Sequence, residues 1–272
     1  MTKRSALRFV LVIGAVSFFA DFTYEGSRSI TGPYLAMLGA SATVVGFVAG
    51  LGELLGYGLR WFSGRLSENS GKYRPITIFG YIVQMASEPL LSLAGSWPAA
   101  AVLIVTERIG KAIRNPPRDV MISHAAKEMG YGWGFGLHEA LDQAGALVGP
   151  LLLATLLSRS HSYPTAFLAL AFPAVATLTL LGCARWTYPE PEGTEPVRRN
   201  LDLREFPPAF WIYLAGTGLV AAGVADFALI AYHFQKAGIV PQSWIPIFYP
   251  SLWESVAYDH WFSANSSTGS AC

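Results

Sequence analysis

The sequence predicts an all-α, multi-pass membrane protein. Its 272 residues are 52% hydrophobic and only 14% charged, whereas soluble domains average about 25% charged residues. Apolar runs of roughly 20 residues, the length that crosses a bilayer as a helix, recur along the chain. The 27 glycines and 17 prolines are typical of closely packed membrane helices. The lipid bilayer is therefore the first expected partner.

Seven membrane spans follow one another along the sequence. The first begins near Leu7 and continues through a polar stretch to about Leu38. We retain it as a helix, because no small-residue cleavage site follows and further spans come after it. The seven expected spans cover 7–38, 42–62, 76–94, 98–122, 133–157, 165–184 and 209–234.

Composition divides these spans into two groups. Residues 1–184 form a six-helix bundle, and the charged, proline-rich stretch 185–207 is expected to be a cytoplasmic linker. Residues 208–249 begin a second, incomplete bundle with the seventh helix. The polar tail, 250–272, indicates that the chain stops or changes reading frame soon after Tyr249. The alternative is a genuine seven-span protein with a polar outer tail.

The basic residues predict the orientation of the chain in the membrane. Most of them fall on alternate connections together with the N-terminus, and the opposite connections hold only Arg159 and Lys236. By the positive-inside rule, the N-terminus is cytoplasmic and the protein lies in the cell (inner) membrane. No basic cluster suited to nucleic acid is present, so nucleic acid is not an expected partner.

Ionisable residues inside the spans are the main functional clue. Asp21, Glu25 and Arg28 are spaced i, i+4 and i+7 on the first helix, with Tyr24 beside them. One carboxylate can neutralise Arg28 and leave the other to carry protons. Such groups are costly in hydrocarbon and usually face a protein interior or a wet path. The alternative is that this stretch is the solvated outer end of the helix.

The fourth and fifth spans carry further ionisable groups. Glu107 and Arg108 lie near the middle of the fourth span, whereas Lys111, Arg114 and Arg118 approach its inner end, where long side chains can extend to the surface. In the fifth span a histidine lies beside carboxylates and is either a proton relay or a structural partner; the residues concerned are His138, Glu139 and Asp142.

The segment between the second and third spans, 64–74, resembles the inner-loop signature of the major facilitator superfamily, G-x-L-a-D-r-x-G-r-r. Two glycines permit a tight turn and close helix approach, and an acidic residue followed by basic ones can form a latch. Glu68 replaces the usual aspartate and Asn69 the usual arginine. The expected conformational gate comprises Gly64, Glu68, Gly71, Lys72 and Arg74.

The fifth span resembles the glycine motif of the antiporter branch of that superfamily, G-x8-G-x3-G-P-x2-G-G. Its counterparts here are Gly136, Gly145, Gly149 and Pro150, while Leu153 and Ala154 replace the terminal glycines. The resemblance implies export rather than uptake. Helix packing by small residues is the purely structural alternative. Arg108 is similar in position to an arginine associated with proton coupling in the superfamily.

The resemblance implies two six-helix bundles that rock about a midplane site, of which this chain holds the first bundle and the seventh helix. The expected activity is proton-coupled export of a small, unknown solute by alternating access, without a metal or cofactor. A lone half would have to pair with another chain, or would be inactive. A membrane-embedded enzyme or a non-transporting membrane scaffold are the alternatives, although no nucleophile or metal-ligand set appears in the sequence.

Overall fold

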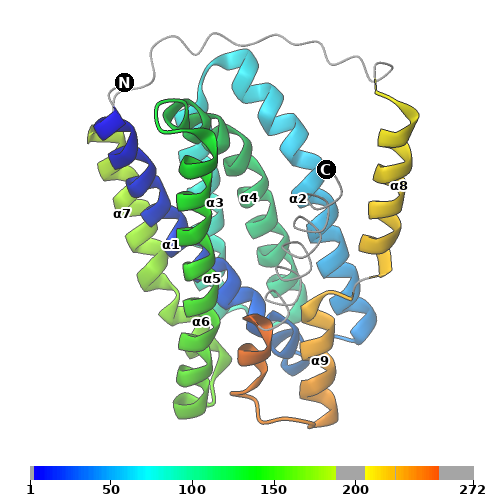
Figure 1. Cartoon of the computed structure of the whole chain (residues 1–272). Helices are drawn as coiled ribbons and strands as arrows, with labels where there is room; N and C mark the ends of the chain where they lie inside the picture. The colour runs from blue at the N-terminus through cyan, green and yellow to red at the C-terminus, as the bar shows by residue number, and fades with distance from the viewer. Residues whose placement is uncertain (1–2, 188–205, 224, 251–272) are drawn as a thin grey trace, which may run out of the picture.

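A computed structural model describes residues 3–187, 206–223 and 225–250, and these ranges contain helices and no strand. The all-α architecture predicted from the sequence is confirmed. The helices run side by side in one bundle, from which α8 stands apart (Figure 1). Their bounds are α1 Lys3–Met37, α2 Ala42–Ser70, α3 Tyr73–Leu90, η1 Leu91–Leu93, α4 Trp97–Ala126, α5 Tyr131–Ser160, α6 Tyr163–Ala169, α7 Ala171–Thr187, α8 Pro208–Gly223, α9 Phe227–Ala237 and η3 Ile245–Ile247.

The first six expected spans each have a counterpart in the structure. The sixth consists of α6 and α7, separated by Leu170. The seventh differs from the prediction, because the continuous helix expected over 209–234 is two helices, α8 and α9. Asp226 is extended (φ −63°, ψ 140°) and its side chain accepts a hydrogen bond from the Ala228 N–H, which starts α9 afresh. Residues 188–205 of the expected linker and 251–272 of the expected tail lie outside the described residues.

Among the described residues, five helical segments are long and apolar enough to cross a membrane: Lys3–Met37, Ala42–Ser70, Tyr73–Leu93, Tyr131–Ser160 and Tyr163–Arg185. α4 has sufficient length, with 30 residues, but its sequence is rich in charged residues. Several of these, including Glu107, Arg108 and Arg114, are buried inside the bundle. These three charges therefore face protein rather than lipid, which is the arrangement a membrane helix requires.

α1 lies at the centre of the bundle, against α5, α7 and α9, while α2 and α3 pack on α4. A Cβ atom on Gly145 would collide with the carbonyl oxygen of Phe18, and one on Gly149 with that of Phe22. These two glycines therefore allow the backbones of α1 and α5 to touch. Gly136 does not share this role: it is exposed, and a Cβ atom there would meet nothing within 4 Å.

α9 packs against α1 and α2. Ala228 of α9 joins the main apolar cluster of the bundle, alongside Ile30 and Leu35 of α1. α8 instead exposes large apolar side chains, among them Ile212, Tyr213 and Leu219. The second part of the seventh span is thus docked on the first bundle, whereas α8 presents an apolar surface to its surroundings.

Candidate functional site

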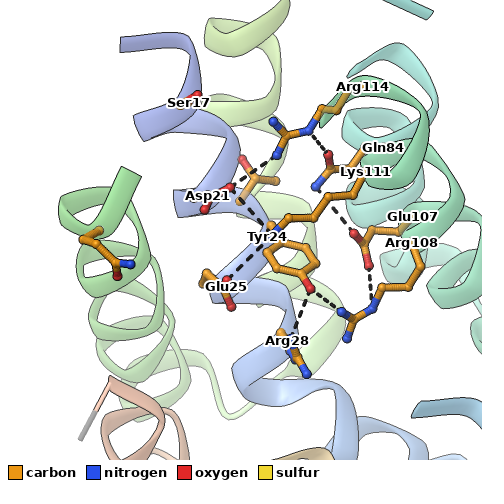
Figure 2. Close-up of polar contacts among 12 residues, drawn as sticks. Ser17, Asp21, Tyr24, Glu25, Arg28, Gln84, Glu107, Arg108, Lys111 and Arg114 are labelled. Atoms are coloured by element: carbon orange, nitrogen blue, oxygen red, sulfur yellow. Dashed lines mark hydrogen bonds and ion pairs between the residues drawn. The ribbon is translucent and has the colours of Figure 1, made fainter. Parts of the chain in front are cut away.

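A polar cavity of about 190 Å³ lies between α1, α2 and α4. α1 contributes Tyr24, Glu25 and Arg28 to its wall. α4 contributes Arg108, Lys111 and Ala112, and α2 contributes Glu53, Gly56, Tyr57 and Arg60. Figure 2 shows the ionisable side chains of α1 and α4 pointing toward one another. Charged residues of the first and fourth expected spans thus line the same cavity.

Arg28 connects three helices. Its Nη2 atom lies 2.8 Å from Glu53 Oε1 on α2 and 2.7 Å from Asp226 Oδ2 at the start of α9. Its Nη1 atom donates to Tyr24 Oη at 3.2 Å. The partners of Arg28 are therefore not Asp21 or Glu25, as the spacing on α1 had indicated. Arg28 does reach one residue on its own face, Tyr24, but its carboxylate partners come from α2 and from the start of α9.

Arg108 occupies the opposite wall. It donates through Nη1 to Tyr24 Oη and to Glu53 Oε1, the latter at 2.9 Å. Its Nε atom lies 3.5 Å from Glu107 Oε2. The side chains of Arg108 and Glu107 are 9% and 8% exposed, so the expected pair is buried inside the bundle. Glu53 thus receives two arginines from two different helices.

Lys111 faces the cavity with looser contacts. Its Nζ atom lies 3.9 Å from Glu25 Oε1 and 4.0 Å from Asp21 Oδ1, beyond hydrogen-bonding distance. The same atom is 3.4 Å from the centroid of the Tyr24 ring, a cation–π contact. Glu25 also accepts a hydrogen bond from Tyr249 Oη. Asp21 and Glu25 therefore balance the lysine without binding it tightly.

Arg114 is fully buried behind the cavity, with a side-chain exposure of 0%. It lies 3.3 Å from Asp21 Oδ1, donates to Gln84 Oε1 at 2.6 Å and donates to Tyr81 Oη at 3.0 Å. Gln84 in turn donates to Glu88 and Glu107 at 3.4 and 3.5 Å. One hydrogen-bonded chain thus runs from α1 through α4 to α3.

These contacts correct the expectation for the basic end of the fourth span. Lys111, Arg114 and Arg118 do not extend to the inner surface; Arg114 and Arg118 are buried, and Lys111 lines the cavity. Arg118 pairs with Asp119 at 2.9 Å and contacts Ser17 Oγ at 3.4 Å. Arg114 finds its acceptors on α1 and α3, whereas the carboxylate partner of Arg118 is the neighbouring Asp119.

The polar residues of α5 separate into two faces. His138 is buried and its Nε2 lies 2.8 Å from Ser17 Oγ on α1. Asp142, one turn later, lies beside Asp21. Glu139 is exposed, and its Oε1 accepts from Gln143 Nε2 at 2.8 Å. The structure therefore brings His138 and Asp142 to the network around α1 and leaves Glu139 outside it.

The motif at 64–74 is more helical than its description as a loop implies. α2 continues to Ser70, so Gly64 and Glu68 lie within the helix. Gly71 ends it in the left-handed conformation (φ 65°, ψ 4°), which favours glycine. Glu68 and Lys72 are both exposed, and the described residues place no ion pair between them. The latch expected from this motif is not formed by that pair here; Arg74 lines a separate small cavity.

Sequence reasoning missed several members of the network. Glu53 was overlooked because a single carboxylate in the apolar second span has no ionisable neighbour in sequence. Asp226 belongs to the triplet Ala225-Asp226-Phe227, which repeats Ala20-Asp21-Phe22 of the first span, but nothing in the sequence pairs it with Arg28. Lys111, Gln84 and Tyr249 also belong to the site. No group of three His, Cys, Asp or Glu side chains arranged to hold a metal ion occurs among the described residues.

Comparison with known proteins places this geometry in a family. The Major Facilitator Superfamily profile matches residues 13–264. An uncharacterised protein of Mycobacterium tuberculosis (strain H37Rv) is 42% identical over 252 residues, which are 90% of this chain and 62% of that protein. The multidrug resistance protein MdtH of Aeromonas hydrophila is 30% identical over 148 residues, covering 54% of this chain and 37% of MdtH. The chain thus spans less than two thirds of these relatives.

A solved structure of a POT family transporter in complex with a thioalcohol-conjugated peptide has the same fold. It aligns with a TM-score of 0.59 and 18% identity, covering 88% of this chain and 49% of the other. At this identity the likeness concerns the fold alone. The profile match extends over most of the chain, and the bundle it predicts is the one observed, so the protein belongs to the major facilitator superfamily.

Proposed function

We propose that the chain is the first bundle and the start of the second bundle of a secondary active transporter that exports a small solute by alternating access, with protons as the coupling ion. The observation that carries the proposal is the cavity of about 190 Å³ between α1, α2 and α4, where Arg28 and Arg108 pair with Glu53 across helices. A wet, charged space inside an apolar bundle is typical of a solute or ion path.

Glu107 and Arg108 form the proposed coupling pair. Glu107 is buried, lies 3.5 Å from the Arg108 Nε atom and accepts from Gln84. Protonation of Glu107 removes the charge that holds Arg108 on that side. Arg108 is then bound mainly by Glu53 and Tyr24, both on the cavity wall. A proton on α4 thereby changes the strength of a contact that joins α4 to α1 and α2.

The Arg28–Asp226 pair is the proposed outer contact between bundles. It joins α1, in the first bundle, to the beginning of α9 at 2.7 Å. Opening toward the outer side requires α9 to move from α1, so this pair must break in each cycle. The motif around Gly64, Glu68, Gly71, Lys72 and Arg74 is the corresponding proposed gate on the cytoplasmic side.

The cytoplasmic N-terminus, the inner-membrane location and the direction of transport are parts of the same proposal. The orientation rests on the distribution of basic residues along the chain. The direction of transport rests on the glycine motif of the fifth span. The similarity to a multidrug resistance protein agrees with export. Alternating access needs two bundles, and the described residues supply the first bundle with α8 and α9 of the second.

The test is proton movement driven by solute in reconstituted vesicles. The chain is inserted into proteoliposomes with an acidic lumen that contains the pH indicator pyranine. Succinate and choline, which do not fluoresce, serve as anionic and cationic probes, and we expect one of them to accelerate alkalinisation of the lumen. Glu107→Gln should abolish this response. Glu139→Gln, which removes an exposed carboxylate outside the network, should retain it.

Vesicles that bind a probe and show no solute-dependent proton movement would refute the transport proposal. An equal response from the parent chain and Glu107→Gln would refute the role of Glu107 while leaving transport intact.

A further inference from the structure

The cavity wall is unevenly charged. It carries four cationic side chains, Arg28, Arg60, Arg108 and Lys111, and two carboxylates, Glu25 and Glu53. Asp21, Glu107 and Asp226 balance the cations from behind, but they are not part of this wall. A solute that enters the cavity therefore meets mainly hydrogen-bond donors.

Each carboxylate of the wall already accepts hydrogen bonds through one of its oxygens. Glu53 Oε1 accepts from Arg28 at 2.8 Å and from Arg108 at 2.9 Å. Glu25 accepts a hydrogen bond from Tyr249 Oη through its Oε2 atom. A cationic solute would have to compete with two arginines for Glu53, and so the wall is poorly suited to one.

Two cations of the wall, Lys111 and Arg60, in contrast keep unused hydrogen-bond donors. Lys111 Nζ makes no hydrogen bond to either neighbouring carboxylate, which lie 3.9 and 4.0 Å away. Arg60 has no carboxylate within 4 Å among the described residues, and its guanidinium lies 4.6 Å from the Tyr57 ring. Its Nε atom is buried without a hydrogen-bond partner. An arginine offers five N–H donors, so most of those on Arg60 are free to bind a solute.

Tyr24 indicates where an anionic group would bind. Arg28 and Arg108 both donate to its phenolic oxygen, and Lys111 lies over its ring. A neutral phenol is a weaker acceptor than a carboxylate or phosphate oxygen, because ionised acceptors form hydrogen bonds roughly twice as strong. Besides their carboxylate partners, Arg28 and Arg108 each donate to this neutral phenol. An ionised group of a solute that took the place of the phenolic oxygen would therefore be bound more strongly.

From this geometry we infer that the cavity binds a small organic anion through a carboxylate or phosphate group held by Lys111, Arg60 and Arg108. The inference rests on the proposed transport function and names its substrate class. The space of about 190 Å³ holds a solute of several heavy atoms, more than a single inorganic ion needs. Tyr57 offers an aromatic surface for the remainder of the solute.

The test is direct binding to the purified chain in a neutral maltoside detergent, which requires no transport. Thermal unfolding is followed with succinate and phosphate as anionic probes, and with choline and mannitol as cationic and neutral ones, at constant ionic strength. We expect the anions at ten times their dissociation constant to raise the midpoint by roughly 3 °C, and choline and mannitol to leave it unchanged. A lower dissociation constant for succinate than for phosphate would identify the group as a carboxylate, and the reverse as a phosphate.

Matched variants locate the site. Lys111→Met and Arg60→Met should each weaken anion binding at least tenfold, and Lys111→Arg should largely restore it. Arg65→Met removes the same charge from an exposed position on α2, five residues after Arg60, and should bind as the parent does. This control separates the cavity from a general effect of positive charge.

Three results would overturn the inference: no anion-dependent shift in the parent chain, a shift produced equally by choline, or equal loss of binding in Arg65→Met and Arg60→Met. Transport of a cation or a neutral solute would refute the anion site and leave the transport proposal standing. Anion binding without any proton movement would refute transport and leave the site standing.

Discussion

The contact between α1 and α5 makes the sharpest prediction about stability. Gly145 and Gly149 lie directly against the backbone of α1, at the carbonyl oxygens of Phe18 and Phe22. Gly145→Ala adds one methyl group where an oxygen atom already sits. Because that oxygen belongs to a helix backbone, it cannot turn aside as the end of a flexible side chain would. The two helices must separate or tilt.

The expected magnitude follows from two opposing effects. Overpacking a close contact costs about 1–3 kcal/mol, and a backbone obstacle favours the upper part of that range. Replacing a mid-helix glycine with alanine gains about 1 kcal/mol of helix propensity. The net loss for Gly145→Ala is then about 2 kcal/mol. At roughly 2–4 °C per kcal/mol, the unfolding midpoint falls by about 4–8 °C.

Gly136 supplies the matched control on the same helix. It is exposed and has open space where its Cβ atom would lie, so Gly136→Ala gains helix propensity without a clash. Thermal unfolding in detergent, followed by the fluorescence of the eight tryptophans, compares the three proteins. We expect Gly136→Ala to unfold at or above the parent midpoint. If Gly136→Ala fell as far as Gly145→Ala, the close approach of α1 and α5 would not be its cause.

Three further changes test other parts of the structure. Asp226→Asn weakens the 2.7 Å pair with Arg28 but keeps an N-cap side chain for α9. We expect faster proteolysis between α8 and α9. A proteolysis rate equal to that of the parent would show that this pair does not hold α9 on α1. Gly71→Ala should lower the free energy of unfolding by about 1 kcal/mol, because the φ of Gly71 is 65°. Gly58→Ala, at a position within α2 that has open space around it, should not lower it. Denaturant titration compares the two variants with the parent. Arg114→Met leaves three buried acceptors unpaired, so its unfolding midpoint should fall by at least several degrees in the same thermal assay; an unchanged midpoint would exclude a structural role.

The membrane helices were predictable because the physics that sets them is local. An apolar run of about 20 residues needs no knowledge of its neighbours to be recognised as a span. The positions at which a span is interrupted were harder to predict, because they depend on contacts with other helices. The seventh span is interrupted at Asp226, which caps α9 and binds Arg28 of α1. The N-cap residue type is visible in the sequence, but the partner nearly two hundred positions away is not.

In the site, too, local features were predictable from the sequence, whereas partners on other helices were not. The i, i+4, i+7 spacing placed Asp21, Glu25 and Arg28 on one helical face, and all three lie on the side of α1 that meets the charged network. Their partners could not be read from the spacing, because they come from other helices. The error at Glu139 was avoidable: adjacent residues on a helix point about 100° apart. His138 and Glu139 could not both face α1.

The repeated triplet illustrates how far sequence similarity within one chain can be taken. Ala20-Asp21-Phe22 and Ala225-Asp226-Phe227 are identical, and parallel-repeat transporters relate their first and seventh helices by symmetry. Asp21, however, lies in the middle of the continuous helix α1 and pairs with Arg114 of α4. Asp226 caps α9 and pairs with Arg28 of α1. One aspartate lies within the first bundle and the other joins α9 to it, so their environments are not equivalent. Exchange of each aspartate for asparagine should therefore give different results, with Asp21→Asn altering the network around Arg114 and Asp226→Asn altering the docking of α9.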